Sequence, residues 1–210
     1  MRVITVASRK GGSLKTTLTR HLAVEAERAG AGSVAIVDTD PMRGLTLWWE
    51  ARKVDTPLLI DISGGLNGAL AAAQRAHVDV LIIDTPPSIA DIVIASIASA
   101  DIVLIPCQPS PDDVRAMIST VAAVKEAGKP FAFVVARTKP NVRATAEVTA
   151  TLSRYGPVVA LLADRVLYAS SATDGRTASE IEPGGAAAAE IGALWTYIAN
   201  ALTEGQGAAA

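Results

Sequence analysis

The sequence has few of the residues that mark metal-binding, disulfide-bonded or membrane-spanning proteins. Its single cysteine, Cys107, excludes a disulfide within the chain and is too little for each subunit of a dimer to hold a bridging iron–sulfur cluster. No uninterrupted apolar run approaches the roughly 18 residues that indicate a membrane-spanning helix. The N-terminus also lacks the charged and then apolar pattern of a signal peptide. We therefore expect a cytoplasmic protein in which Cys107 is a small buried hydrophobic residue.

The chain also lacks a large excess of charge of either sign. Its 19 basic and 21 acidic residues give a formal net charge of −2. This balance argues against a module that coats nucleic-acid phosphates by bulk charge, but it leaves a local basic patch open. Hydrophobic residues make up 50% of the 210 residues and aromatic residues 4%, so we expect a core of Ala, Val, Leu and Ile. The length suits one domain, which we expect to span residues 1–203, with a disordered tail at 204–210.

Residues 9–17 read Arg-Lys-Gly-Gly-Ser-Leu-Lys-Thr-Thr, between an apolar β-branched run at residues 3–7 and a helical pattern that begins near Thr16. A strand, a glycine-bearing turn and a helix start in this order are typical of a phosphate-binding loop. Glycines let backbone N–H groups approach an anion, the helix N-terminus adds unpaired donors, and Lys15 can reach the terminal phosphates. Thr16 would then offer its hydroxyl to a magnesium ion.

This loop departs from the strict pattern G-x-x-x-x-G-K-[ST] at both glycines, which are Arg9 and Leu14 here. If the position of Leu14 needs left-handed dihedral angles, its Cβ costs roughly 1–2 kcal/mol, before any clash of the side chain with a phosphate or with the loop. Because about 1.4 kcal/mol corresponds to a tenfold change in affinity, we expect the fold to survive and nucleotide handling to be weakened or altered. The alternative interpretation of residues 9–17 is a polar turn with a helix cap.

Two further strands are predicted to end in acidic residues. An apolar run at residues 33–38 leads into Asp38-Thr39-Asp40-Pro41, and a second run at residues 78–84 ends in Asp84. A right-handed βαβ crossover brings the carboxyl ends of such strands next to the loop. Carboxylates there can support a magnesium ion or orient an attacking water. The alternative interpretation of Asp38 and Asp40 is a solvated acidic turn in which Asp40 caps the next helix.

Several segments together resemble one known family. Residues 10–16, Lys-Gly-Gly-x-x-Lys-Thr, resemble the deviant Walker A loop of the ParA/MinD superfamily, K-G-G-x-G-K-[ST], at six of seven positions. Residues 38–41 resemble its switch segment D-x-D-P-Q, residues 78–84 its Walker B strand, and residues 106–113 its P-x-x-P-S-P-x-D segment. Residues 43–53 are most similar to ParF-like plasmid partition ATPases. The resemblance covers nearly the whole chain and implies their fold.

The resemblance also implies roles for individual residues. Lys10 would complete the partner's nucleotide site in an ATP-dependent sandwich dimer, Lys15 would hold phosphates, and Asp40 would orient the attacking water. The residues implied to place Mg²⁺ are Thr16, Asp38 and Asp84. The residues implied to bind ATP or ADP are Lys10, Gly11, Gly12, Ser13, Leu14, Lys15, Thr16 and Thr17, with Arg137 and Thr138 at the base.

The function implied is that of a ParA-like ATPase that segregates or positions a plasmid, a chromosome or another large cargo. Its ATP-bound homodimer would bind DNA without sequence preference and associate with the nucleoid. A ParB-like or other activating adaptor protein would stimulate hydrolysis and release it. The alternative function, supported by Leu14, is a nucleotide-gated scaffold or adaptor with little or no hydrolysis.

Strand and helix patterns alternate along the chain, which predicts a single-domain α/β fold with a mostly parallel twisted sheet and helices on both faces. We expect an exposed, linker-like stretch at residues 175–185 and a closing helix at residues 186–202 with an apolar stripe toward the sheet. Because this helix carries no Lys or Arg, we expect no membrane anchor. A modest DNA-binding face is expected, against the alternative of ordinary solvated surface. Its candidate residues are Arg137, Lys139, Arg143, Arg154, Arg165 and Arg176.

Overall fold

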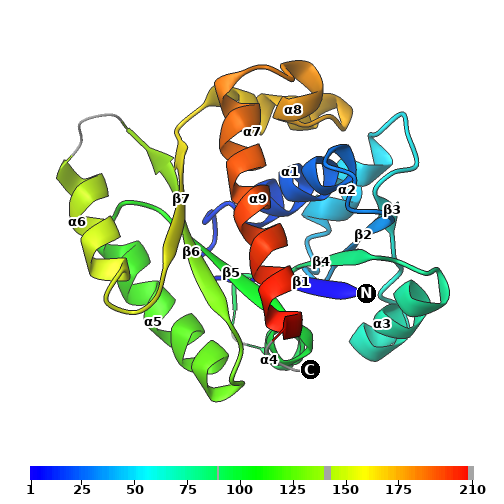
Figure 1. Cartoon of the computed structure of the whole chain (residues 1–210), viewed down its shortest axis with the longest axis horizontal. Coiled ribbons are helices and arrows are strands. Elements are labelled where there is room, and N and C mark those ends of the chain that lie inside the picture. The colour runs from blue at the N-terminus through cyan, green and yellow to red at the C-terminus, as the bar shows by residue number, and fades with distance from the viewer. Residues whose placement is uncertain (89, 140–142, 208–210) are drawn as a thin grey trace.

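The chain folds into a twisted parallel sheet with helices on both faces (Figure 1). The structure is a computed structural model that describes residues 1–88, 90–139 and 143–207. Within this part of the chain, all neighbouring strands of the seven-stranded sheet run parallel. Across the sheet the strands are β3 (Leu58–Leu59), β2 (Val34–Asp38), β4 (Val80–Asp84), β1 (Arg2–Val6), β5 (Ile102–Cys107), β6 (Phe131–Thr138) and β7 (Val158–Ala163).

Helices divide between the two faces of this sheet. One face is covered by α1 (Lys15–Arg28), α2 (Gly44–Glu50), α7 (Val166–Ser170), a 3-10 turn (Ser171–Asp174), α8 (Ala178–Ile181) and α9 (Ala186–Gly207). The other face is covered by α3 (Gly65–Arg75), α4 (Asp91–Ser99), α5 (Pro111–Glu126) and α6 (Arg143–Leu152). The predicted α/β fold with helices on both faces is therefore confirmed.

Alternating side chains of the central strands supply both halves of the core. Ile4 of β1 and Ile82 of β4 pack in the cluster beneath α1 and α9, whereas their neighbours Val3 and Leu81 pack in the cluster on the opposite face. This alternation follows from the two-residue repeat of a strand. Because both faces are covered, both sets of side chains are apolar, which explains why the strands read as continuous apolar runs in the sequence.

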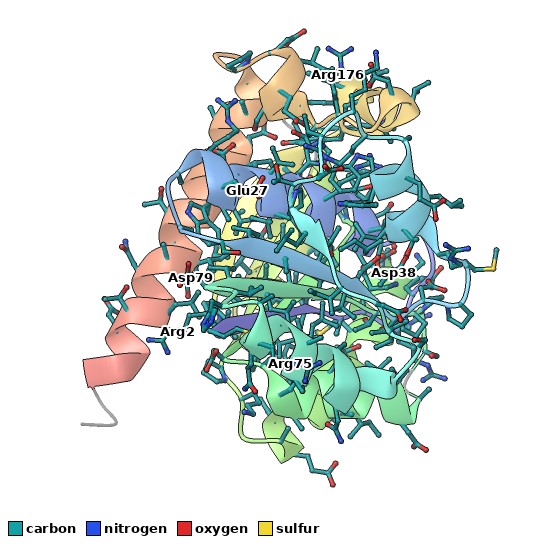
Figure 2. All side chains as sticks on the ribbon, turned by 90° about the vertical axis from the view of Figure 1, so that its right-hand side faces the viewer. Arg2, Glu27, Asp38, Arg75, Asp79 and Arg176 are labelled. Carbon is teal, nitrogen blue, oxygen red and sulfur yellow. The ribbon has the colours of Figure 1, made fainter. Side chains whose placement is uncertain are left out.

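The carboxyl ends of the strands lie together at one end of the sheet. Figure 2 shows Asp38 at this end and Arg2 and Asp79 at the other, where the Arg2 N–H donates to the Asp79 carbonyl at 2.7 Å. The neighbouring strands β1 and β5 continue in opposite directions across the sheet, since β1 leads to β2 and β5 leads to β6. Ligand sites of open α/β sheets form where the loops diverge in this way.

The stretch 175–185 was expected to be an exposed linker; residues 177–179 are instead buried against α1, whereas residues 182–184 are exposed as expected. The stretch contains α8, which begins with a capping box between Thr177 and Glu180. Thr177 and Ala178 are fully buried, and the Ala178 N–H donates to Nε2 of His21 at 3.1 Å. The glycine-rich, charged composition indicated a linker. The burial of residues 177–179 depends on a helix that lies 157 positions away in the sequence.

The C-terminal helix confirms its expected role and exceeds its expected length. Its apolar stripe is buried; the residues are Ile191, Leu194, Trp195, Ile198 and Leu202. The helix runs to Gly207, so residues 204–207, expected to begin a disordered tail, are helical, while 208–210 lie outside the described residues. Among the helices of the described residues, none is both long and apolar enough to cross a membrane.

The end of the strand β6, which was predicted at residues 131–136, differs from the prediction. β6 extends to Thr138, so Arg137 and Thr138 belong to the strand and do not follow it. The predicted helices at 89–100 and 142–154 are α4 and α6, and their expected first residues, 89 and 142, lie outside the described residues. α5 begins with a side-chain cap, because the Ser110 hydroxyl accepts from the Asp113 N–H at 3.2 Å.

Candidate functional site

The loop between β1 and α1 contains two residues with left-handed backbone angles. Gly12 has φ 74°, which glycine adopts without steric cost. Leu14 has φ 72° and ψ 22° and directly precedes α1, where its carbonyl accepts from the Leu18 N–H at 2.8 Å. Leu14 therefore does adopt the left-handed angles considered from the sequence, and the steric strain of its Cβ is part of the loop.

The first turn of α1 meets the carboxylate at the end of β4. The Thr16 hydroxyl donates to Oδ2 of Asp84 at 2.6 Å, and the Thr19 hydroxyl lies 3.4 Å from Oδ1. Burial raises the pKa of Asp84 to about 7, and the hydrogen bond from Thr16 opposes this rise. Burial also lowers the pKa of Lys15, while the charge of Asp84 raises it. An ammonium and a carboxylate are thus both removed from water next to a helix N-terminus.

The two acids after β2 have different surroundings. Asp38 is buried, and its Oδ2 accepts from the N–H and the hydroxyl of Thr46 at 2.8 and 3.0 Å. Asp38 therefore caps the first turn of α2, a role that the alternative interpretation gave to Asp40. Asp40 accepts from the Met42 N–H at 3.0 Å and lines the cavity beside the loop.

The opposite flank of the loop is attached to the start of α5. The Lys10 ammonium forms an ion pair with the buried carboxylate of Asp113, which raises the pKa of Lys10. The Gln108 side-chain amide donates to the Gly12 carbonyl at 2.7 Å, and the Arg9 N–H donates to the Thr120 hydroxyl at 3.3 Å. Lys10, the residue implied to reach a partner, is thus held within its own chain.

We use the name loop cavity for a cavity of about 240 Å³ beside the loop. Its lining residues are Gly11, Gly12, Ser13, Leu14, Lys15, Thr16, Thr17, Asp40, Pro87 and Arg137. The predicted residues Gly11–Thr17, Asp40 and Arg137 are therefore brought together. Among the described residues, the Ser13 hydroxyl is buried and has no hydrogen-bond partner. An unpaired buried hydroxyl in a cavity with a buried ammonium and helix N–H groups fits an oxyanion such as phosphate.

The same cavity also fits a magnesium ion that is bound together with phosphates. Within the described residues, no group of three or more His, Cys, Asp or Glu side chains could hold a metal ion. Mg²⁺ does not need such a cage, because it commonly binds one or two carboxylates together with waters and substrate phosphates. Thr16 and Asp84 present hard oxygen donors of this kind, whereas the carboxylate of Asp38 is engaged with Thr46.

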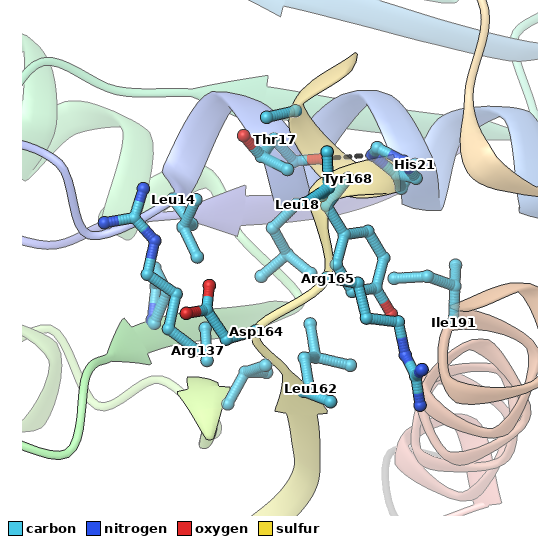
Figure 3. Close-up of a pocket in the computed structure, with 16 residues that line it drawn as sticks. Leu14, Thr17, Leu18, His21, Arg137, Leu162, Asp164, Arg165, Tyr168 and Ile191 are labelled. Atoms are coloured by element: carbon cyan, nitrogen blue, oxygen red, sulfur yellow. Dashed lines mark hydrogen bonds between the residues drawn. The ribbon is translucent and has the colours of Figure 1, made fainter. Parts of the chain in front are cut away.

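A second cavity adjoins the loop cavity and is named the apolar pocket (Figure 3). It encloses about 400 Å³. Its lining residues are Leu14, Thr17, Leu18, His21, Pro106, Val134, Ala136, Arg137, Leu162, Ala163, Asp164, Arg165, Val166, Tyr168, Ala169 and Ile191. Leu14, Thr17 and Arg137 line both cavities, so the two adjoin at these residues. The volume lies in the range of about 300–1,000 Å³ that is typical of small-molecule sites.

The two neighbouring residues predicted to contact a base, Arg137 and Thr138, have different surroundings in the structure. Arg137 lies at the junction of the two cavities, with φ 55°. Thr138 is buried, and its hydroxyl donates to the Leu162 carbonyl at 3.1 Å. Thr138 lines neither cavity. The prediction of a base contact is thus compatible with the position of Arg137, whereas Thr138 holds β6 to β7.

Sequence reasoning missed most of the apolar pocket and the ion-pair partner of Lys10. Leu18, Leu162 and Ile191 have the pattern of ordinary core residues, and nothing local distinguishes a pocket wall from a packed interior. Asp113 was read from the sequence only as part of the segment 106–113 that resembles the family's P-x-x-P-S-P-x-D segment. Two adjacent acids at a helix start were the available signal, since one of them can cap while the other is free to bind a cation.

The predicted DNA-binding residues include several ion-paired arginines. Arg143 Nε lies 2.6 Å from Glu147, Arg165 Nη2 lies 2.7 Å from Glu190, and Arg176 Nη2 lies 2.7 Å from Asp174. Figure 2 shows Arg176 beside α8, away from Asp38. These pairs reduce the local positive potential, which favours the alternative of an ordinary solvated surface at these positions.

Comparisons with known proteins agree with this geometry. The family described as the CobQ/CobB/MinD/ParA nucleotide binding domain matches residues 4–178. The maintenance of carboxysome distribution protein A of Halothiobacillus neapolitanus is 30% identical over 200 residues, which cover 89% of this chain and 91% of that protein. Protein ParA of Rhizobium radiobacter is 33% identical over 126 residues, or 59% of this chain and 54% of that protein. The solved structure of apo McdA from Cyanothece has a TM-score of 0.78 at 19% identity, with 96% of this chain and 99% of that chain covered.

Proposed function

The chain belongs to the CobQ/CobB/MinD/ParA nucleotide-binding family, and from this premise we propose that it is a ParA-type ATPase that positions DNA or another large cargo. In this proposal the chain binds ATP with Mg²⁺, dimerises, and binds DNA without sequence preference. A ParB-like or other activating adaptor protein stimulates hydrolysis, which returns the chain to its ADP form. The protein would then be cytoplasmic and associated with the nucleoid.

The observation that carries the proposal is the convergence of Lys15, Thr16 and Asp84 at the start of α1. The hydrogen bond of 2.6 Å between Thr16 and Asp84 places a hydroxyl and a carboxylate side by side, and Lys15 is buried beside them. This is the donor set that phosphoryl transfer by P-loop enzymes requires, a lysine for phosphates and a hydroxyl and an aspartate for the metal.

The residues of the chain then have separate tasks. When bound, Mg²⁺ supplies positive charge that neutralises the phosphate oxygens; Thr16 and Asp84 would hold it, with Asp38 in its surroundings. The Lys15 ammonium and the N–H groups of the first turn of α1 stabilise negative charge on the phosphates. Asp40, at the edge of the loop cavity, would orient the attacking water.

Dimerisation requires a change at Lys10 in this proposal. In the structure Lys10 pairs with Asp113 of its own chain. To complete the nucleotide site of a partner, the Lys10 side chain has to exchange this carboxylate for the partner's phosphates. The exchange is feasible because the Lys10 side chain is 36% exposed and Asp113 keeps hydrogen bonds from the Ser110 hydroxyl and the Gln108 N–H.

Light scattering and DNA-binding titrations with ATP, ADP and no nucleotide test the proposal. We expect a dimer and DNA binding with ATP and Mg²⁺ only, with DNA affinity that falls as salt rises. Lys15→Ala should weaken ATP binding at least about 100-fold, whereas Lys10→Ala should bind ATP and remain monomeric. Dimerisation that needs no nucleotide, or DNA binding that ignores salt, would contradict the proposal.

The second candidate function is a nucleotide-gated scaffold with little or no hydrolysis. The left-handed conformation of Leu14 favours it, because strain next to the phosphates can slow a reaction without preventing binding. Measurement of phosphate release from ATP, with adaptor and DNA present, distinguishes the two candidate functions. Phosphate release supports the ATPase. No phosphate release from a protein that still dimerises with ATP supports the scaffold.

The residues of the site support a proposal for the class of cargo and not for one individual cargo. The names of the two relatives refer to carboxysome distribution in one case and to ParA in the other. We propose a cargo large enough to carry many copies of an activating adaptor, such as a plasmid, a chromosome region or a protein body.

A further inference from the structure

Leu14 occupies a position where a side chain is conformationally costly, and the structure shows where that side chain goes. Its angles of φ 72° and ψ 22° are strained for any residue with a Cβ. In the family pattern this position is glycine, so a leucine has no role in holding the phosphates. A favourable contact of the Leu14 side chain would compensate for the steric cost of its backbone angles.

The compensating contact is the wall of the apolar pocket. Leu14 is half-buried and packs against the core cluster beneath α1 and α9. Leu14, Thr17, Leu18 and His21 all line the pocket, at the spacing i, i+3, i+4 and i+7 that defines one face of a helix. Leu14 therefore adds one more position to the pocket face of α1, at the end nearest the phosphate-binding loop.

Figure 3 shows the Leu14 side chain pointing into the pocket between Arg137 and Leu18. Leu14 lines both cavities, so its side chain stands at their junction without filling the apolar pocket. About 400 Å³ remain open with the leucine in place. This volume argues against a plug and in favour of a wall that a ligand can contact.

The chemistry of the pocket suits a flat, mostly apolar group attached to an anion. Its walls are mostly apolar and include the rings of His21 and Tyr168, and its polar side chains, among them Arg137, Asp164 and Arg165, offer both hydrogen-bond donors and acceptors. The anion would lie in the loop cavity next to Lys15, where the two cavities meet. A nucleoside triphosphate has this composition, with its phosphates and its sugar and base at opposite ends.

We propose that Leu14 is a specificity-determining residue that packs against the sugar and base of the bound nucleotide, so that this chain derives more of its nucleotide affinity from the base side than a glycine form would. The inference rests on the proposed function, since it assigns the sugar and base of that same nucleotide to the apolar pocket. It differs from the expectation of a simple clash, because the leucine contacts the nucleoside end and not the phosphates.

Calorimetric titration with two probes tests this inference. One probe is ATP with Mg²⁺, and the other is inorganic tripolyphosphate with Mg²⁺, which has the phosphates without sugar or base. The chain is compared with Leu14→Ala, Leu14→Gly and the control Leu47→Ala, which removes a leucine that is 57% exposed on α2 and lines neither cavity. Thermal unfolding of each variant verifies that it is folded.

We expect the preference for ATP over tripolyphosphate to fall about tenfold in Leu14→Ala and in Leu14→Gly, because loss of apolar contact in a pocket typically changes binding by about 10- to 200-fold. Leu47→Ala should leave the preference unchanged. Tripolyphosphate affinity should be constant in Leu14→Ala and constant or higher in Leu14→Gly, where the backbone strain is relieved.

Two outcomes would overturn the inference, and they are distinguishable from failure of the proposed function. An unchanged preference in both Leu14 variants would mean that the leucine does not contact the nucleoside. A stronger preference for ATP in either variant would mean that the leucine obstructs it. If the chain and all its variants bound neither probe, the proposed function itself would be wrong.

Discussion

The two adjoining cavities are built in different ways. The loop cavity takes most of its lining from one consecutive segment, residues 11–17, whereas the lining of the apolar pocket is spread from Leu14 to Ile191. A contiguous segment suffices for an anion because loop and helix N–H groups already point in one direction. An apolar pocket has no such local design, since its walls are side chains that meet only after β6, β7, α7 and α9 have packed. One half of the ligand site is thus formed by a short segment of the chain, and the other half forms only when distant elements pack together.

The largest expected effect concerns the wall of the apolar pocket. Burial, with a smaller contribution from the charge of Arg20, lowers the pKa of His21 to about 3 from the ordinary 6.5, against an opposing effect of Glu180. The stabilising contribution of neutral His21 is fully present above about pH 6.5 and is lost as the pH falls toward about 3, because the unfolded chain is protonated first. Linkage sets an upper limit of about 5 kcal/mol on this loss.

Thermal unfolding as a function of pH checks this prediction. His21→Gln should flatten the dependence of the unfolding midpoint between about pH 7 and about pH 4, because it removes the titrating group. His77→Asn is the matched control, since His77 is exposed at the end of α3 with φ 53°, a conformation that asparagine accepts. The same pH dependence in the two variants would contradict the assignment.

The next largest effect concerns the loop cavity. Lys15→Ala should weaken ATP binding at least about 100-fold, or about 2.7 kcal/mol, because charge-assisted contacts to phosphates are lost while helix donors remain. Tripolyphosphate should lose affinity to the same extent, in contrast to the Leu14 variants. Titration calorimetry measures both, with the exposed Lys125→Ala of α5 as control. A loss confined to ATP would place Lys15 at the nucleoside end.

A smaller effect concerns the ion pair that holds Lys10 to α5. Asp113→Asn should strengthen ATP-dependent dimerisation about 1.4-fold to fivefold, because an ion pair of this partial exposure opposes release of Lys10 by about 0.2–1 kcal/mol. Asp112→Asn is the matched control, since its side chain is 81% exposed and lies 3.6 Å from Arg115. Sedimentation with and without ATP reports the change. Equal effects of both variants would show that general charge, and not Lys10, is responsible.

The smallest effect lies outside both cavities. Arg154→Gln should reduce the slope of log affinity for DNA against log salt by about 1 per subunit, if Arg154 contacts one phosphate. Arg75→Gln, on α3, which packs near β2 and β4 and far across the sheet from α6 and β7, should leave the slope unchanged. Anisotropy titrations across salt concentrations measure both slopes. Identical slopes for the two variants would place the DNA-binding surface elsewhere.

The prediction from sequence was most accurate where structure is local. The strands that end in Asp38 and Asp84 and the helix start near Thr16 were read from short patterns and are confirmed, with α1 beginning at Lys15. The prediction of an exposed linker was wrong at residues 177–179, because their burial depends on contacts with α1 that no local pattern records.

Within the site, the anion-binding half was identified by residue number and the apolar half was not. Lys15, Thr16 and Asp84 stand at recognisable positions after strands and before a helix, so their proximity follows from parallel topology. Leu162, Tyr168 and Ile191 have the sequence pattern of core residues, and they are buried in the structure. They form a pocket only because a cavity remains between them. The pairing of Lys10 with Asp113 likewise joins residues 103 positions apart.

The sequence by itself determined the order of strands and helices, the loop with its glycines and lysine, and the acids at the strand ends. Backbone dihedral preferences, hydrogen-bonded turns and apolar periodicity act over a few residues, so they are legible in the chain. Only the tertiary structure decided the apolar pocket, the partner of Lys10 and the direction of the Leu14 side chain. These depend on which distant side chains pack against one another, and packing is settled by the whole core together.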